Sequence, residues 1–292
     1  MFLKKIKNII INIDNKIFKS SIINTYLKIK YFFKIRKVYA SIKITDIEKK
    51  KRHNLNKELI ISLTSYSKRF NTLPLVLSSL QEQTILPDKI ELWIEEDDKH
   101  LLPEKIYNFK IVNVKFCENG LFSYKKIIPS LEENDNRFIA TFDDDIIYPT
   151  NSLEALISKS KKFPNDIIAN RIHVIKLKDS FPDTYDKWQK NSKGDNNLNF
   201  FTGAGGVLYP PKCFYKYILN KKEIMKLCPS NDDIWLNWMV KLNGKKIRYS
   251  GIDQEFTMIR LIKSGLFKKN VKQNFNDVQI KRIIAKYGFP YN

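Results

Sequence analysis

The sequence predicts an α/β fold in which a mostly parallel sheet is flanked by helices. Short apolar runs suited to buried strands alternate with amphipathic segments of helical period over residues 59–169. Acidic side chains follow directly where one of these runs stops, at Asp143. Because open α/β sheets bind ligands at the carboxyl ends of their strands, these observations place a candidate site at that edge.

The first strand–helix–strand unit spans residues 59–94. Leu59–Thr64 is an apolar run, and residues 73–83 place three leucines and Val76 on one helical face. Pro87-Asp88 is a turn signal before the second expected strand, Lys89–Ile94. Strands joined through a helix are parallel, so the unit begins a parallel sheet.

The alternation continues along the chain. Further strands are expected at residues 110–116, 137–142 and 166–169, and further helices at residues 124–131, 152–161 and 232–242. Residues 191–197 are polar and loop-like. This order of elements predicts a doubly wound core.

Positive charge is concentrated near the start of the chain. The net charge is +21, and residues 1–52 carry fifteen Lys and Arg against three acidic residues, a net of +12. Apolar side chains recur at helical spacing from Phe18 to Phe33. We expect residues 1–55 to form a basic amphipathic helical extension and residues 56–292 to form the main domain, with residues 49–52 as a charged linker. The helix either lies on an anionic membrane surface or packs on the domain.

The composition also restricts the cellular location and the binding partners that we expect. Three cysteines lie far apart and no apolar run approaches the ~20 residues that cross a bilayer. Charged residues interrupt the apolar ones from Met1 to Lys7, so we expect no signal peptide there. We expect a cytoplasmic protein, peripheral at the inner face of the cytoplasmic membrane through residues 1–52. A basic nucleic-acid-binding protein is the alternative; the charge clusters at the chain ends while acids gather in the middle, so no nucleic-acid partner is expected.

The acidic run Asp143-Asp144-Asp145 is the first candidate site. Adjacent carboxylates repel one another unless a cation compensates. Mg²⁺ and Mn²⁺ prefer oxygen ligands and commonly take one or two carboxylates plus substrate phosphates. The run therefore indicates a divalent-metal site for a nucleotide diphosphate, with a solvated acidic turn as the alternative.

Two further motifs carry possible chemistry. Asp232-Asp233 opens the last predicted helix, where carboxylates either cap the helix or serve as a catalytic base. Gly203–Gly206 holds three glycines, which allow backbone to approach a ligand or to form a tight turn before a strand. Trp235 and Trp238 on the same helix are expected in the core.

In order and spacing, these motifs resemble the inverting glycosyltransferases of family 2, which have the GT-A fold, a Rossmann-like fold. More narrowly they resemble bacterial surface-polysaccharide transferases of capsule, lipopolysaccharide or O-antigen synthesis. The similar segments lie within residues 58–255: 61–66 with Arg69, 79–93, 123–129, 141–149, 171–188, 203–206 and 232–233. The chain departs from the family at Asp232, where Glu is usual, and at residues 64–66, which are Thr-Ser-Tyr in place of Pro-x-Tyr-Asn.

The resemblance implies roles for individual residues. Asp145 with Asp143 would hold Mn²⁺ or Mg²⁺, and Asp233 with Asp232 would supply the general base. The donor-nucleotide set is Thr64, Ser65, Tyr66, Arg69, Glu96, Asp97, Lys126, Asp143 and Asp144. The acceptor set is Arg171, His173, Trp188, Gly203, Gly205 and Gly206.

The implied reaction transfers a sugar with inversion from a nucleotide-diphosphate sugar, with UDP as the expected nucleotide. The acceptor would be a hydroxyl of a glycan or lipid-linked glycan. A catalytically inactive glycan-binding relative is a second alternative.

Overall fold

The computed structural model describes residues 50–252, 256–259 and 274–291, which belong to one compact unit. The expected amphipathic helix near residues 18–33 lies outside the described residues. Among the described helices, none combines the length and the apolar character needed to cross a membrane.

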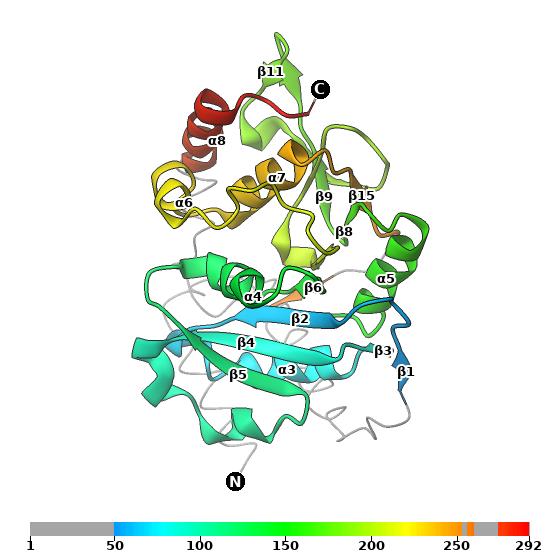
Figure 1. Ribbon diagram of the computed structural model, residues 1–292, viewed down its shortest axis with the longest axis vertical. Coiled ribbons are helices and arrows are strands. Elements are labelled where there is room, and N and C mark those ends of the chain that lie inside the picture. The colour runs from blue at the N-terminus through cyan, green and yellow to red at the C-terminus, as the bar shows by residue number, and fades with distance from the viewer. Residues whose placement is uncertain (1–49, 253–255, 260–273, 292) are drawn as a thin grey trace, which may run out of the picture. The chain divides into compact units, whose positions relative to one another are not determined.

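A seven-stranded sheet in the order β5-β4-β2-β6-β14-β8-β15 forms the centre of this unit (Figure 1). Its strands all run in one direction except β14, which is antiparallel to β6 and β8. The predicted α/β class with a mostly parallel, Rossmann-like sheet is therefore confirmed. The strands are β2 (Leu59–Thr64), β4 (Lys89–Glu95), β5 (Val112–Cys117), β6 (Phe138–Thr141), β8 (Ile167–Ala169), β14 (Val207–Tyr209) and β15 (Ile247–Tyr249).

Helices cover both faces of the sheet. α3 (Leu73–Gln81) leads from β2 out to β4, whereas η5 (Phe122–Lys126) and α4 (Ile128–Glu133) lead from β5 back to β6. Right-handed crossovers in opposite directions put their helices on opposite faces, as Figure 1 shows for α3 and α4. The helix expected over 124–131 is divided at Ile127, because Pro129 lacks an N–H and fits only the first turn of a new helix.

A smaller antiparallel sheet, β12-β9-β13, lies beyond β8 in the chain. Its strands are β9 (Ile172–Val174), β12 (Gln189–Ser192) and β13 (Asn199–Phe201). α7 (Asp232–Leu242) packs against β13 and α8 (Phe275–Tyr287), and α5 (Ser152–Lys162) packs on β8 and β14. The other elements are β1 (Lys51–Arg52), β3 (Ile85–Leu86), β7 (Ile146–Ile147), β10 (Leu177–Lys178), β11 (Phe181–Pro182), β16 (Thr257–Met258), α6 (Lys221–Leu227), η2 (Ser67–Arg69), η3 (Glu96–Leu101), η4 (Glu104–Asn108), η6 (Tyr185–Lys187) and η7 (Gly203–Gly205).

The beginning of the compact unit differs from the expected linker. Lys51 and Arg52 form β1, which pairs in parallel with β3. Lys50 Nζ donates to Gln81 O at 2.7 Å, and His53 Nε2 lies 3.0 Å from Asp88 Oδ2. Residues 50–53 therefore belong to the unit, which begins before residue 56.

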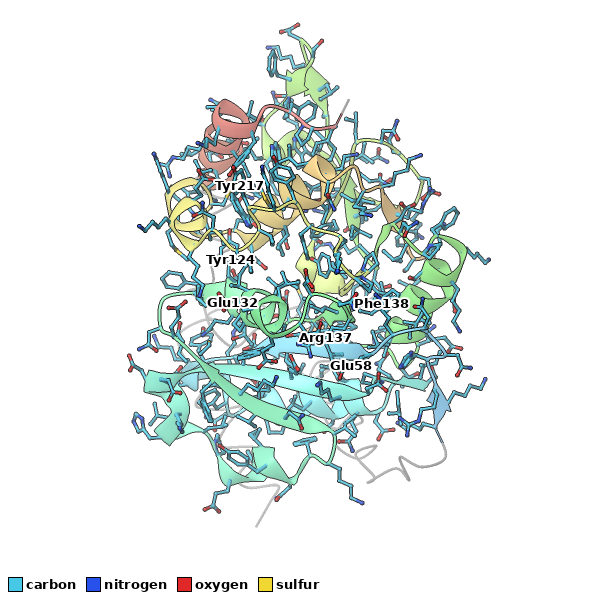
Figure 2. All side chains as sticks on the ribbon, viewed as in Figure 1. Glu58, Tyr124, Glu132, Arg137, Phe138 and Tyr217 are labelled. Carbon is cyan, nitrogen blue, oxygen red and sulfur yellow. The ribbon has the colours of Figure 1, made fainter. Side chains whose placement is uncertain are left out.

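Buried side chains of η5 and α7 belong to the same hydrophobic core. Trp235 and Trp238 of α7 are fully buried, which confirms the expected core role. Tyr124 of η5, labelled in Figure 2, is also fully buried, and its Oη donates to Cys228 O at 2.7 Å. This contact fixes η5 against the segment that leads into α7.

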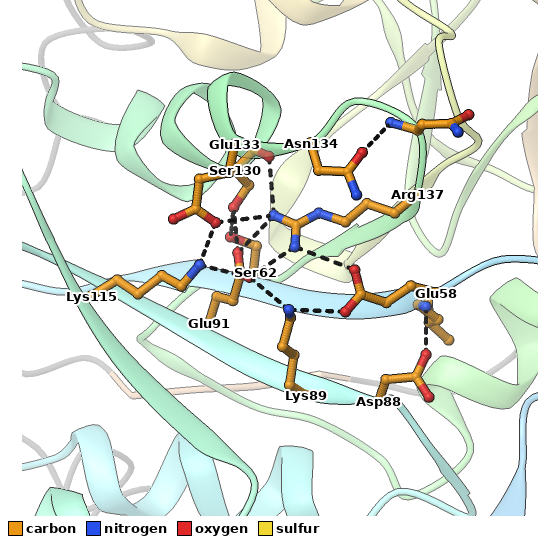
Figure 3. A network of polar contacts seen from close by, with 12 residues as sticks. Glu58, Ser62, Asp88, Lys89, Glu91, Lys115, Ser130, Glu133, Asn134 and Arg137 are labelled. Atoms are coloured by element: carbon orange, nitrogen blue, oxygen red, sulfur yellow. Dashed lines mark hydrogen bonds and ion pairs between the residues drawn. The ribbon is translucent and has the colours of Figure 1, made fainter.

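A buried ion network fixes α4 and β6 to β4 (Figure 3). Glu91 of β4 is fully buried, and Arg137 donates to its two carboxylate oxygens at 2.9 and 3.1 Å. Lys115 Nζ and Ser130 Oγ each donate to Glu91 at 3.0 Å. Because Ser130 lies on α4 and Arg137 directly precedes β6, the network holds both elements that lead to the candidate site.

Candidate active site

Lys126 joins the two acidic motifs at the carboxyl end of β6. Its Nζ lies 2.7 Å from Asp143 Oδ1 and 3.0 Å from Asp232 Oδ2, and only 6% of its side chain is exposed. Burial alone would lower the pKa of Lys126, but Asp143, Asp232 and Asp233 hold that pKa well above its ordinary value. Residues far apart in the sequence thus form one charged cluster around a buried ammonium group.

Asp233 has the setting of a general base. The Gly203 N–H donates to its Oδ1 at 2.9 Å, which orients the carboxylate at the start of α7. Burial first and Asp232 second raise the pKa of Asp233 to about 8, with Lys126 opposing them. A carboxylate whose pKa lies near neutrality can accept a proton from a hydroxyl group more effectively than an ordinary Asp.

Gly203 lies in the middle of this cluster. A Cβ at this position would come within 2.9 Å of Lys126 Nζ and 3.1 Å of Asp233 Oδ1. The backbone can therefore approach both groups only because residue 203 has no side chain.

The carboxylates of the Asp143–Asp145 run have different surroundings. Asp144 is buried, where it accepts a hydrogen bond of 2.6 Å from Ser65 Oγ and pairs with Arg69 Nη1. Asp145 pairs with Arg69 Nη2 at 3.0 Å, and 35% of its side chain is exposed. Asp143 has 27% of its side chain exposed. Asp144 therefore anchors the segment after β2, while Asp143 and Asp145 keep accessible oxygens.

Asp143 and Asp145 are the residues of this run that could hold a hard divalent cation together with substrate phosphates. Among the described residues, no group of three or more His, Cys, Asp or Glu side chains could hold a metal ion. Burial and then Asp143 raise the pKa of Asp145 to about 6, which reflects crowded negative charge that a cation would relieve. One or two carboxylates suffice for Mg²⁺ or Mn²⁺ when phosphate oxygens complete the shell.

The segment after β2 lies beside this run. Thr64 Oγ1 donates to Trp93 O at 2.8 Å, so its hydroxyl is bound to β4. The guanidinium of Arg69 lies 5.4 Å from the centre of the Tyr66 ring. Ser65 and Arg69 thus contact the acidic run directly, and Tyr66 supports Arg69.

The acidic segment at the end of β4 contacts the same loop through a residue that sequence reasoning missed. Asp98 Oδ2 accepts a hydrogen bond of 2.9 Å from the Ser67 N–H. Glu96 and Asp97, assigned to the donor, are exposed. The signal for Asp98 was its place in the run of acids that starts at Glu95.

Asn191 connects Arg171 and His173, two of the residues assigned to the acceptor by the resemblance. Arg171 Nε donates to Asn191 Oδ1 at 2.9 Å, and the Asn191 N–H donates to His173 Nδ1 at 3.2 Å. Burial first, then Arg171 and Lys190, lower the pKa of His173 to about 3, so its imidazole is neutral. Sequence reasoning did not single out Asn191, which lies in a polar stretch without a motif.

Trp188 does not occupy an acceptor-facing position. It is 2% exposed, packs on Tyr185 and Phe200, and donates from Nε1 to Asp183 O at 2.9 Å. The structure therefore corrects its assignment from acceptor contact to core packing. An aromatic residue near a motif gives no sequence signal that separates these roles.

Gly205 and Gly206 serve the packing of the glycine loop. A Cβ at residue 205 would lie 2.8 Å from Arg171 Cβ. Gly206 has φ +94°, and a Cβ there would meet the Phe142 ring at 2.5 Å. Both glycines let the loop lie close to its neighbours, and Gly203 contacts the acidic cluster itself.

Comparison with known proteins gives likenesses of structure only. No family model and no curated protein matches the chain. The Staphylococcus aureus TarS 1–349 structure shares 18% identity over 68% of this chain and 59% of that one, with a TM-score of 0.43. Its complex with UDP-GlcNAc shares 16% identity over 68% of this chain and 57% of that one, with a TM-score of 0.44. The structure of a 4-diphosphocytidyl-2C-methyl-D-erythritol synthase shares 12% identity over 76% of this chain and 99% of that one, with a TM-score of 0.43. The chain thus spans less than two thirds of the TarS fragment.

Proposed function

We propose that this chain is a glycosyltransferase that moves a sugar from a nucleotide-diphosphate sugar to a hydroxyl group of a glycan. One observation carries the proposal: Lys126 brings the Asp143 carboxylate and the Asp232-Asp233 pair into one cluster at the carboxyl end of the sheet. In this proposal, a site for an anionic leaving group and a base for an incoming hydroxyl would lie side by side. Such a pair is what direct displacement at a sugar carbon requires.

The residues divide the work of that displacement. Asp143 and Asp145 would hold Mn²⁺ or Mg²⁺, which when bound neutralises the diphosphate. Arg69 holds Asp144 and Asp145 in place, and Lys126 balances the charge of the carboxylates around it. Asp233, oriented by the Gly203 N–H, accepts the proton of the acceptor hydroxyl as the oxygen attacks the anomeric carbon. Attack opposite the leaving diphosphate inverts the configuration at that carbon.

The finer assignments are part of the same proposal. UDP is the proposed nucleotide, and the proposed acceptor is a bacterial surface glycan of capsule, lipopolysaccharide or O-antigen type, free or lipid-linked. The basic residues 1–52 would hold the enzyme at the inner face of the cytoplasmic membrane. These assignments rest on the family resemblance and on the charge of that segment.

A thermal-shift panel tests the proposal. UDP-, GDP-, CMP- and dTDP-sugars are added to the full-length chain with and without Mn²⁺. We expect one nucleotide class to raise Tm, more strongly with Mn²⁺, and Asp145→Asn to remove the metal-dependent part. A chain that no nucleotide sugar stabilises would sink the proposal.

Turnover separates the enzyme from its alternatives. We expect Asp233→Asn to keep the donor-induced shift while nucleotide release with an acceptor mixture falls by about 10²-fold or more. Unchanged release in that variant would remove Asp233 as the base. Sugar binding without nucleotide release by the wild type would favour the inactive relative, and a salt-sensitive gel shift with RNA or DNA would favour the nucleic-acid-binding alternative.

A further inference from the structure

A cavity of about 390 Å³ lies beside the candidate active site. Ile146 and Ala204 form part of its lining, and these residues directly follow Asp145 and Gly203 in the chain. Tyr148 links the two places, because its Oη accepts the Asp143 N–H at 2.9 Å and donates to Ala204 O at 3.5 Å. The cavity and the acidic cluster are therefore connected through Tyr148 and through adjacent positions of the chain.

The lining combines polar groups with apolar and aromatic surface. Arg171, Asn170 and Asn191 contribute charge and amide groups, while Tyr249 and Phe256 contribute rings. A carbohydrate offers polar edges and faces of C–H groups, so it matches such a lining. The mixture also follows the usual plan of ligand pockets, in which a few polar groups orient the ligand on apolar walls.

Arg171 is held in this lining through one nitrogen. Asn191 lies at a β-bulge of β12 in a left-handed conformation (φ 52°) and accepts the Arg171 Nε–H at 2.9 Å. Bulges commonly re-aim side chains in this way. Among the residues that the structure describes, only Nε of Arg171 is engaged, so its two terminal amino groups can receive a carboxylate or phosphate bidentately.

No carboxylate within the described part of the chain forms an ion pair with Arg171. The other arginines there that are not fully exposed each have an acidic partner: Arg69 pairs with Asp144, Arg137 with Glu91 and Arg248 with Asp166. Arg171 is partly exposed, so a ligand in the cavity can reach its guanidinium without displacing a described carboxylate. Arg171 therefore points to an anionic ligand.

We propose that this cavity binds the acceptor, and that the acceptor carries an anionic group that Arg171 receives. The anion is a carboxylate of an acidic sugar or a phosphate ester on the glycan. The identity of the ligand as an acceptor rests on the proposed glycosyltransferase function, whereas the anion site itself does not.

Matched probes test the anion site on the full-length chain. Calorimetry compares methyl galactoside, methyl galacturonide and methyl galactoside 6-phosphate, which differ only at C6. We expect one or both acidic probes to bind about tenfold or more tightly than the neutral one, as a charged hydrogen-bonded pair allows. The tighter acidic probe identifies carboxylate or phosphate as the natural group.

Substitutions at Arg171 test whether this residue causes the preference for an acidic probe. We expect Arg171→Gln to reduce the preference to below about twofold and Arg171→Lys to keep part of it, because Lys keeps the charge without the bidentate geometry. Arg282→Gln is the matched control, since Arg282 is exposed on α8 and does not line the cavity. Equal binding of all three probes, or an unchanged preference in Arg171→Gln, would overturn the proposal.

UDP binding measured in parallel keeps the two proposals apart. The control variant Arg282→Gln, whose residue lies outside the cavity lining, should bind UDP with Mn²⁺ as the wild type does. If the wild type does not bind UDP but prefers an acidic probe through Arg171, the anion site stands and the glycosyltransferase proposal fails.

Discussion

Lys126 donates from Nζ to Asp143 Oδ1 at 2.7 Å, from a side chain that is almost fully buried. The same nitrogen lies 3.0 Å from Asp232 Oδ2. A buried ion pair is strongly destabilised when one partner is removed, because the remaining charge has no counterpart. The relationship makes Lys126 the natural first target.

Replacing Lys126 with Met leaves three carboxylates without their shared cation. We expect the free energy of unfolding to fall by about 3–5 kcal/mol. We also expect Mn²⁺ to raise Tm more in the variant than in the wild type, because the uncompensated carboxylates attract the metal more strongly. Lys125→Met is the matched control: Lys125 is equally buried but pairs with Glu95 at 3.4 Å, outside the cluster. Equal Mn²⁺ effects in both variants would contradict the shared-charge explanation.

The pH dependence of turnover should report the protonation state of Asp233. Its pKa is raised to about 8, and a base acts only when deprotonated, so kcat/KM should rise as pH increases through that region. Asp232 is the second cause of the shift after burial, so Asp232→Asn should move the acid limb to lower pH. Initial rates of nucleotide release from pH 5.5 to 9.5 provide the measurement. An acid limb that stays in place in Asp232→Asn would show that another group controls it.

Gly203→Ala tests the close approach of backbone to the acidic cluster. The added Cβ would crowd Lys126 Nζ and Asp233 Oδ1 without demanding a left-handed backbone. We expect kcat/KM to fall by about 10²-fold, the effect of a misplacement near 1 Å, with a small change in Tm. Gly194→Ala is the control, since its Cβ meets nothing within 4 Å. Similar activities for both variants would show that Gly203 needs no such closeness.

Glu91→Gln tests the buried network beneath the site. Arg137 and Lys115 would lose their buried counter-ion and keep only the more exposed Glu58 and Glu133, so we expect a loss of about 3–5 kcal/mol in urea unfolding at neutral pH. Burial acts to raise the pKa of Glu91, but Lys115 and Arg137 hold it below its ordinary value. The stabilisation is therefore complete above the unfolded-state pKa and lost as pH falls through the folded-state pKa, and the gap between wild type and variant should narrow in acid.

The control for Glu91 is Glu133→Gln. Glu133 pairs with the same Lys115, yet 42% of its side chain is exposed. An exposed pair contributes about 1 kcal/mol or less, so this variant should unfold near the wild-type urea midpoint. If both variants lose the same stability, burial of Glu91 is not the cause.

The membrane proposal is testable in the full-length chain. We expect a variant with five basic residues of the N-terminal segment changed to Gln to sediment less with phosphatidylserine vesicles, because each removed charge weakens the attraction by about 1 kcal/mol. Those residues are Lys28, Lys30, Lys34, Arg36 and Lys37. Phosphatidylcholine vesicles provide the uncharged control. Undiminished binding to anionic vesicles would remove the electrostatic explanation.

The sequence by itself determined the elements with strong periodicity. Leu59–Thr64 is a mostly apolar run, and Lys89–Ile94 is apolar apart from Lys89 and Glu91. Parallel strands are buried on both faces, so the type and order of these two elements could be predicted. The position of Asp143 directly after such a run also predicted an acidic strand end at the site. These features are local, since each depends on residues within a few positions of one another.

The tertiary structure alone decided which of those residues act together. Lys126 pairs with Asp232, which lies 106 positions later in the chain. Arg69 pairs with both Asp144 and Asp145, of which Asp144 is buried and Asp145 is partly exposed. The antiparallel β14 and the burial of Trp188 likewise depend on packing between distant elements. Periodicity reports which face of an element is apolar and carries no information on the partner that covers it, so these contacts required the fold.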